Sequence, residues 1–179
     1  MFRYNKAQRG RLMILRALLF APLMLVAAAA ADIVEDRFTS GVWQGDANYD
    51  TDGQFSDCTM TAESKRGVLL GFVISKDFDW GIVIADETKA LEVGSRKAVL
   101  LIVDGLNPIA AVAKVVDKHG ILIPLENSDP MVEALRHGKV LRIVTDGAEF
   151  SFELTDTRDA IAALAACATE HQGTERVQL

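Results

Sequence analysis

Two cysteines constrain the fold of this chain more than any other feature. Cys58 and Cys167 are the only cysteines among its 179 residues, and about 110 positions separate them. Cys58 lies in an alternating stretch at 54–62, and Cys167 lies on the apolar stripe of a helix predicted for 157–168. Both sulfur atoms are therefore predicted to face inward. A disulfide between them would tie the last helix to an early strand; the alternative is two buried free thiols.

The first 31 residues have the three parts of an export signal. A basic leader without acidic residues precedes an apolar run at 17–26, and three alanines ending at Ala31 form a small-residue cleavage site. We predict a signal peptide at 1–31, cleaved after Ala31. The uncharged run after Arg16 is only about 15 residues long, short of the roughly 20 that span a bilayer. We therefore expect no stable membrane anchor after cleavage.

Removing this leader changes the charge of the chain. The leader carries five of the 19 Lys and Arg residues, so 14 remain against 25 Asp and Glu, a net charge of −11. Such an acidic protein is a poor partner for nucleic acid or anionic membrane surfaces. Two cysteines in an exported chain indicate an oxidising compartment, where a disulfide persists. The predicted location is periplasmic or secreted.

The mature chain is predicted to form a single β-rich domain at 32–170, with a flexible tail at 171–179. Short apolar or alternating runs separated by turn residues predict about nine strands, at 41–49, 54–62, 67–75, 80–85, 98–103, 109–116, 121–125, 139–145 and 150–154. The continuous apolar runs at 67–75, 80–85 and 98–103 indicate strands buried on both faces. Asp146-Gly147 predicts a tight turn.

Two segments have the pattern of helices. A short one is predicted near 129–137, and an Ala-rich one at 157–168 has Asp156 or Thr157 as its candidate cap. The predicted fold class is α+β, mostly antiparallel β, with a sandwich or barrel-like sheet.

The acidic turn at 46–53 is the most suggestive candidate for a metal site. Asn48, Asp50 and Asp52, followed by Gly53, match positions 1, 3, 5 and 6 of a calcium loop. The twelfth position should be a bidentate Glu and is Thr59. A solvated hairpin turn explains the same residues, and no other cofactor is expected.

The remaining polar residues offer little chemistry. His119, His137 and His171 have no second ligand at a zinc spacing, so surface or capping roles are the better interpretation. The sequence contains no C-x-x-C, G-x-S-x-G, P-loop or G-x-G-x-x-G motif. Asp77 and Asp79 are either a carboxylate pair or a polar hairpin loop.

Trp43 with Tyr49 could form an exposed aromatic platform for a glycan or peptide. Core packing is the alternative interpretation, and the one that we favour, because a tryptophan in a predicted strand usually anchors that strand to the interior.

Several fixed positions resemble the invasion-associated locus B family of exported alphaproteobacterial proteins. They are, in order, WQG at 43–45, F..C at 55–58, VDG at 103–105, DP..EALRHGK at 129–139, and F.F.L at 150–154 before the Ala-rich helix. The chain lacks the additional central cysteines and the Gly-Phe that members often carry near the final helix. The resemblance implies a β-rich envelope protein linked to host-cell interaction, without established catalytic residues.

These observations predict an exported, non-enzymatic binding protein whose partner is a protein of the envelope or host. The alternative is a small periplasmic hydrolase or metal-assisted enzyme that uses the acidic turn at 46–53. A pocket gathering histidines and carboxylates would favour the enzyme. A contiguous exposed apolar patch would favour the binding protein.

Overall fold

The computed structural model describes residues 36–125, 129–145 and 148–174. All of them belong to one compact unit. The predicted signal peptide at 1–31, the turn residues Asp146 and Gly147, and the tail beyond Thr174 lie outside the described residues.

The described chain folds into ten strands and two helices, which confirms the predicted α+β class. The strands are β1 (Arg37–Ser40), β2 (Trp43–Tyr49), β3 (Phe55–Glu63), β4 (Leu69–Ser75), β5 (Trp80–Ala85), β6 (Arg96–Val103), β7 (Ile109–Asp117), β8 (Gly120–Leu125), β9 (Val140–Thr145) and β10 (Ala148–Glu153), and the helices are α1 (Asp129–His137) and α2 (Thr157–His171).

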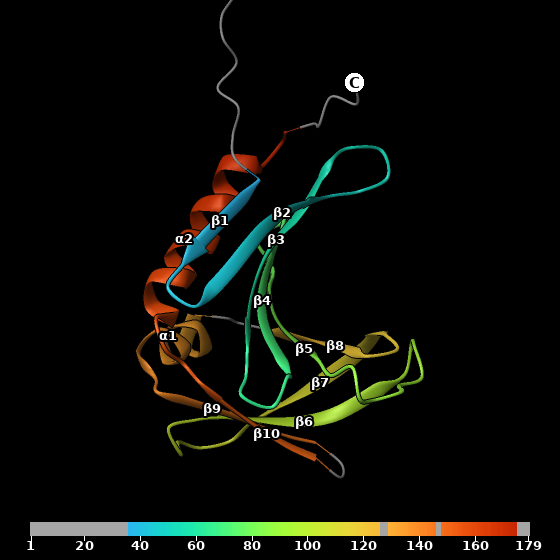
Figure 1. The fold of residues 1–179 in the computed structure, drawn as a ribbon, viewed down its shortest axis with the longest axis vertical. Coiled ribbons are helices and arrows are strands. Elements are labelled where there is room, and N and C mark those ends of the chain that lie inside the picture. The colour runs from blue at the N-terminus through green and yellow to red at the C-terminus, as the bar shows by residue number, and fades with distance from the viewer. Residues whose placement is uncertain (1–35, 126–128, 146–147, 175–179) are drawn as a thin grey trace, which may run out of the picture. The chain divides into compact units, whose positions relative to one another are not determined.

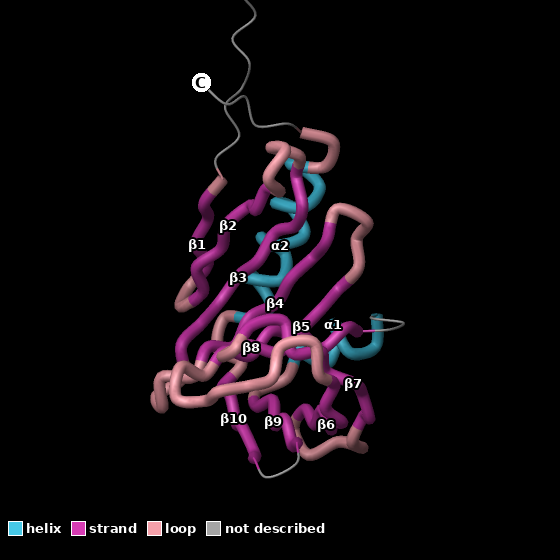
Figure 2. Tube along the Cα trace, turned by 90° about the vertical axis from the view of Figure 1, so that its right-hand side faces the viewer, coloured by secondary structure: helices cyan, strands magenta, loops and turns pink. Residues whose placement is uncertain are grey.

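One antiparallel sheet contains all ten strands, in the order β1-β2-β3-β4-β5-β8-β7-β6-β9-β10. The first five strands follow one another as a meander, and two pairings, β5 with β8 and β6 with β9, join strands that are not consecutive. In Figures 1 and 2, β1 and β2 lie toward one end of this unit, and β6, β9 and β10 lie toward the other.

The helices lie on the inner face of the sheet, where the core is built. α2 packs against β1 to β4 and also contacts α1, and Figure 1 shows α2 running along β1. The inner side chains of the sheet alternate with outward ones, as in β2, where Trp43 and Ala47 are buried. Of the described helices, neither is long and apolar enough to cross a membrane.

The sequence did not predict β1. This strand has only four residues, and its burial alternates weakly because it is an edge strand. The ring of Phe38 lies against Gly45 of β2, where a Cβ atom would overlap the ring. Because Gly45 has no side chain, the Phe38 ring can pack against β2 and hold the short edge strand in place.

Three details of the C-terminal region differ from the prediction. α2 continues to His171, three residues past the predicted end. Asp156 is at the N-cap with a φ of 58°, and its side chain makes no capping hydrogen bond. The flexible tail does not begin at His171, because that side chain is buried and the amide of Phe55 donates to the carbonyl of Thr174 at 3.2 Å.

Asp104 ties the end of β6 to the start of β9. Its backbone is left-handed, with a φ of 50°. Its Oδ1 accepts hydrogen bonds from the backbone amides of Lys139 and Val140, both at 2.9 Å. These bonds, the one from Lys139 first, lower the pKa of the Asp104 carboxyl below its ordinary value.

This contact predicts a stability that depends on pH. Because the pKa of Asp104 is lower in the folded state, its contribution is present above the unfolded pKa and is lost as the pH falls through the folded pKa. Asparagine tolerates the left-handed backbone, so Asp104→Asn should keep the fold. Between about pH 5 and pH 2, the urea midpoint of Asp104→Asn should fall by less than that of the parent. Asp52→Asn, at an exposed turn, is the control. Equal losses in all three proteins would contradict the assignment.

Candidate functional site

Cys58 and Cys167 lie at the centre of the contact between β3 and α2. The structure brings their sulfur atoms to bonding distance, with the two Cα atoms 6.2 Å apart, within the range of disulfides. Cys58 has no exposed surface, and Cys167 is also buried. The helix stripe that carries Cys167 also buries Ala160 and Leu164, so the sulfur atoms are part of the core.

The acidic turn at 46–53 is a hairpin between β2 and β3. Asp50 Oδ1 accepts the backbone amides of Asp52 and Gln54, each at 2.9 Å, so this oxygen closes the turn. Asn48 points elsewhere, and its Nδ2 donates to Asp57 at 2.8 Å. No group of three His, Cys, Asp or Glu side chains suited to a metal ion occurs within the described ranges. Calcium at Asn48, Asp50 and Asp52 stays a prediction.

The other predicted polar residues also serve the fold. Asp77 and Asp79 are exposed in the turn between β4 and β5, where the hydroxyl of Ser75 accepts both of their backbone amides. His137 is exposed at the end of α1, 3.3 Å from Glu133. These residues form a turn and a helix end and do not converge on a cavity.

His171 is not a surface residue. It is 1% exposed, its Nδ1 lies 2.8 Å from the hydroxyl of Tyr49, and its ring stacks on Phe55. Sequence reasoning missed this position because the polar residues that follow suggested a tail. The available signal was its spacing, seven and four residues after Leu164 and Cys167, which continues the apolar stripe of α2.

Trp43 is in the core. Its side chain is 1% exposed, its ring centroid lies 5.2 Å from that of Phe72, and its Nε1 donates to the carbonyl of Thr155 at 2.9 Å. The prediction of core packing is confirmed. Tyr49 is half-buried and contacts His171, so the two residues do not form an exposed platform.

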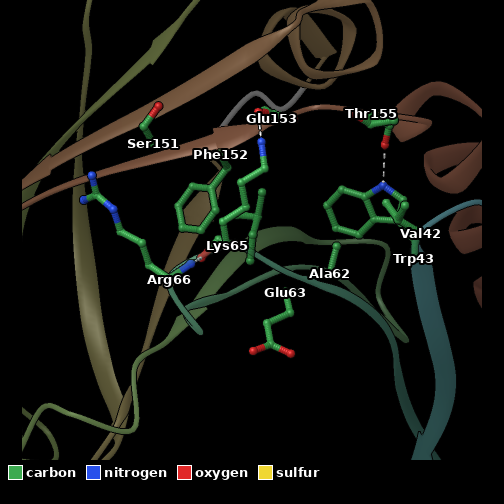
Figure 3. Close-up of a pocket in the computed structure, with 12 residues that line it drawn as sticks. Val42, Trp43, Ala62, Glu63, Lys65, Arg66, Ser151, Phe152, Glu153 and Thr155 are labelled. Carbon is green, nitrogen blue, oxygen red and sulfur yellow. Dashed lines mark hydrogen bonds and ion pairs between the residues drawn. The ribbon is translucent and has the colours of Figure 1, made fainter.

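A pocket of about 330 Å³ lies beside Trp43, where the turn between β3 and β4 approaches β10. Its wall is apolar at Trp43, Leu70 and Phe152, and charged residues surround its mouth. Figure 3 shows Lys65 directed to Glu153, 2.9 Å away. Among the described residues, the ring nitrogens of His171 and His119 lie within hydrogen-bonding distance of the Tyr49 hydroxyl and the Lys89 carbonyl, and no histidine ring bonds a serine or threonine hydroxyl.

A smaller cavity of about 170 Å³ lies between the loop after β5 and the strands β9 and β10. The Nδ1 of His119 lies 2.6 Å from the carbonyl of Lys89, so it holds this loop against the turn between β7 and β8. Asp86 accepts a bond from the hydroxyl of Thr88, which lowers the pKa of Asp86. Both polar side chains are used to fix the loop.

An exposed apolar surface lies on the hairpin of β6 and β7. We define the hairpin surface as three outward-facing side chains, Leu100, Val112 and Val116, which are 40%, 54% and 52% exposed. Leu100 is directly opposite Ala110, and Val112 is opposite Ala98, so alanines continue the surface across both strands. Exposed apolar patches of this kind commonly mark interaction sites.

The hairpin surface also corrects a prediction. The run at 98–103 was expected to be buried on both faces, but β6 buries Val99, Leu101 and Val103 and exposes Leu100. Leu100 is 40% exposed, so neither described helix covers it. The continuous apolar run therefore has one face in the core and one face exposed to solvent.

Comparison with known proteins supports the fold. The crystal structure of invasion associated protein B from Bartonella henselae aligns with a TM-score of 0.52 and 21% sequence identity, over 75% of this chain and 97% of that chain. The resemblance expected from the sequence motifs is thus confirmed at the level of fold. No family model and no curated protein matches the sequence.

Proposed function

We propose that this chain is an exported, non-enzymatic binding protein that acts in the cell envelope or at the host surface, and that its partner is a protein. The hairpin surface carries the proposal. Leaving these three large aliphatic side chains in water is unfavourable by roughly 25 cal/mol per Å² of apolar area, and a partner that covers them recovers this free energy.

Two further observations support the proposal. The cysteine pair at bonding distance fits an oxidising compartment. The predicted leader at 1–31 would export the chain to such a compartment. In the cavity of about 170 Å³, His119 and Asp86 hold the loop after β5, and at the pocket beside Trp43, Lys65 and Glu153 are paired with each other. A covering partner explains the exposed side chains better than a small-molecule reaction does.

Affinity capture with a matched control tests this function. The bait is the mature protein, and the variant Leu100→Ser/Val116→Ser removes two members of the hairpin surface. The control Val42→Ser/Leu69→Ser changes two other exposed aliphatic residues, which are 58% and 37% exposed. The envelope or host protein captured by the parent should also be captured by the control. The hairpin variant should retain it at least ~10-fold less, because central apolar contacts each contribute ~1–2 kcal/mol.

Capture of the same protein by all three baits would refute the hairpin surface as the contact. Capture of no protein by the parent would refute the binding function itself. Circular dichroism of the variants should match that of the parent, since both substitutions are on exposed side chains.

A further inference from the structure

The sheet opens between β7 and β8. The two strands pair through Asp117↔Gly120, Val115↔Ile121 and Lys114↔Leu122, and their pairing stops there. Both strands nevertheless continue: β7 pairs with β6 back to Ile109, and β8 pairs with β5 as far as Leu125. Five residues of β7, 109–113, thus have a β neighbour on one side only.

The backbone of β7 determines which groups face this opening. The amide of Val115 donates to the carbonyl of Ser95, and its carbonyl accepts from Gly94, so Val115 faces β6. Hydrogen-bonding direction alternates along a strand, and the register with β6 is regular from Lys114 to Ile109. The N–H and C=O groups of Ala110 and Val112 therefore point away from β6, into the opening.

Pro124 explains why β8 does not close the opening. The amide of Asp86 donates to the carbonyl of His119, so this pair is hydrogen-bonded between the β5 and β8 sides. Hydrogen-bonded pairs recur every second residue, at Ile84↔Ile121 and Ile82↔Ile123, so the residues of β8 between them direct their backbone groups toward β7. The nitrogen of Pro124 consequently faces β7, and it carries no hydrogen to donate. After Lys114↔Leu122, the next hydrogen-bonded pair would be Val112 with Pro124, and there β8 has no N–H to donate to β7.

The opening is a groove of about 640 Å³ with an apolar floor and a basic rim. Leu101, Leu125 and Met131 line it from the inner side, and Ile109 and Val112 flank it. Arg96 and Lys114 are exposed at its rim and make no ion pair with any described residue. Two unpaired cations in an acidic chain favour an acidic ligand.

We propose that this groove binds an extended peptide of a partner protein, which pairs with β7 as an added strand and carries acidic residues next to apolar ones. The inference rests on the proposed binding function and specifies the ligand. Ala110 and Val112 supply the backbone bonds, the floor accepts alternate apolar side chains, and Arg96 and Lys114 contact the acidic positions. The ligand is a peptide strand because the unpaired N–H and C=O groups of β7 can hydrogen-bond an extended backbone, which an apolar patch alone cannot do.

Synthetic peptides provide the direct test. The probe is a fluorescent peptide of alternating valine and threonine with glutamate at both ends, measured by anisotropy. We expect it to bind, and we expect at least ~10-fold weaker binding for the same peptide with lysine ends or with alternate amides N-methylated. The amides of Ala110 and Val112 should exchange with solvent at least ~10-fold more slowly when the glutamate peptide is bound.

Variants of the protein locate the site. Arg96→Glu/Lys114→Glu should reverse the preference, so that the lysine peptide binds better than the glutamate peptide. The control Lys76→Glu/Lys118→Glu makes the same charge change at two other exposed lysines and should keep the original preference. Val112→Pro removes one outward N–H and should weaken binding, whereas its fold is retained because that N–H has no partner in β8.

Several results would overturn the peptide proposal. The N-methylated peptide could bind as tightly as the unmodified one, or the amides of Ala110 and Val112 could exchange at the same rate with and without peptide. The Arg96→Glu/Lys114→Glu variant could still prefer the glutamate peptide. Sedimentation experiments could also show a dimer of this chain that uses this groove. If the groove variants still capture the partner while Leu100→Ser/Val116→Ser does not, the peptide proposal fails and the binding function stands. If the parent protein captures no partner, the binding function fails.

Discussion

Replacing Cys58 and Cys167 together by alanine lowers the free energy of unfolding by about 4 kcal/mol. The two cysteines are 109 residues apart, and a bridge across a loop of this length restricts the unfolded chain strongly. Without it, α2 is held on β1 to β4 by packing alone. For a domain of this size the loss corresponds to a fall in melting temperature of roughly 10–15 °C.

Three measurements separate the bridge from the loss of two buried side chains. Reduction of the parent protein with dithiothreitol should lower its urea midpoint toward that of the alanine pair, and the same treatment should leave the alanine pair unchanged. Protein recovered from the periplasm should have a mass without residues 1–31 and without the two thiol hydrogens. Two reactive thiols in the folded protein would contradict the bridge, and a retained leader would contradict the proposed cleavage on export.

The elements with strong local patterns were predicted from the sequence. The turns at Asp50 to Gly53, at Asp77 to Asp79 and at Asp117 to Gly120 were recognised because turn residues separate apolar runs, and each one joins paired strands. The short helix at 129–137 was placed correctly because Pro130 and Gly138 limit it. Local chemistry fixed these positions, so no knowledge of the tertiary fold was required.

The features that define the candidate binding site depend on the tertiary fold. Leu100 looks like a core residue in the sequence, and it is exposed because no described element covers the outer face of β6. Pro124 was included in a predicted strand, but its effect depends on which neighbour its nitrogen faces, and that follows from the pairing of β5 with β8. Strand order in a ten-stranded sheet is set by contacts between distant residues, which periodicity does not report.

Trp43→Ala is expected to destabilise the fold by about 3–5 kcal/mol, the range measured for large buried aromatic residues. The indole is 1% exposed and packs on Phe72, so its removal leaves a cavity between β2 and β4. The change also removes the bond from Nε1 to the carbonyl of Thr155, which holds the segment before α2. The unfolding midpoint in urea should therefore fall without a loss of sheet content in the native baseline.

Two variants distinguish packing from the hydrogen bond. Trp43→Phe keeps an aromatic ring and loses the donor, so it should cost less than Trp43→Ala, with about 1 kcal/mol of its loss due to the bond. Trp80→Ala changes the other tryptophan, which is half-buried, and should cost markedly less than Trp43→Ala because less area leaves the core. Circular dichroism in the far ultraviolet follows all three variants without relying on tryptophan fluorescence. Equal losses of unfolding free energy in Trp43→Ala and Trp80→Ala would contradict the prediction. They would show that the greater burial of Trp43 does not determine its contribution to stability.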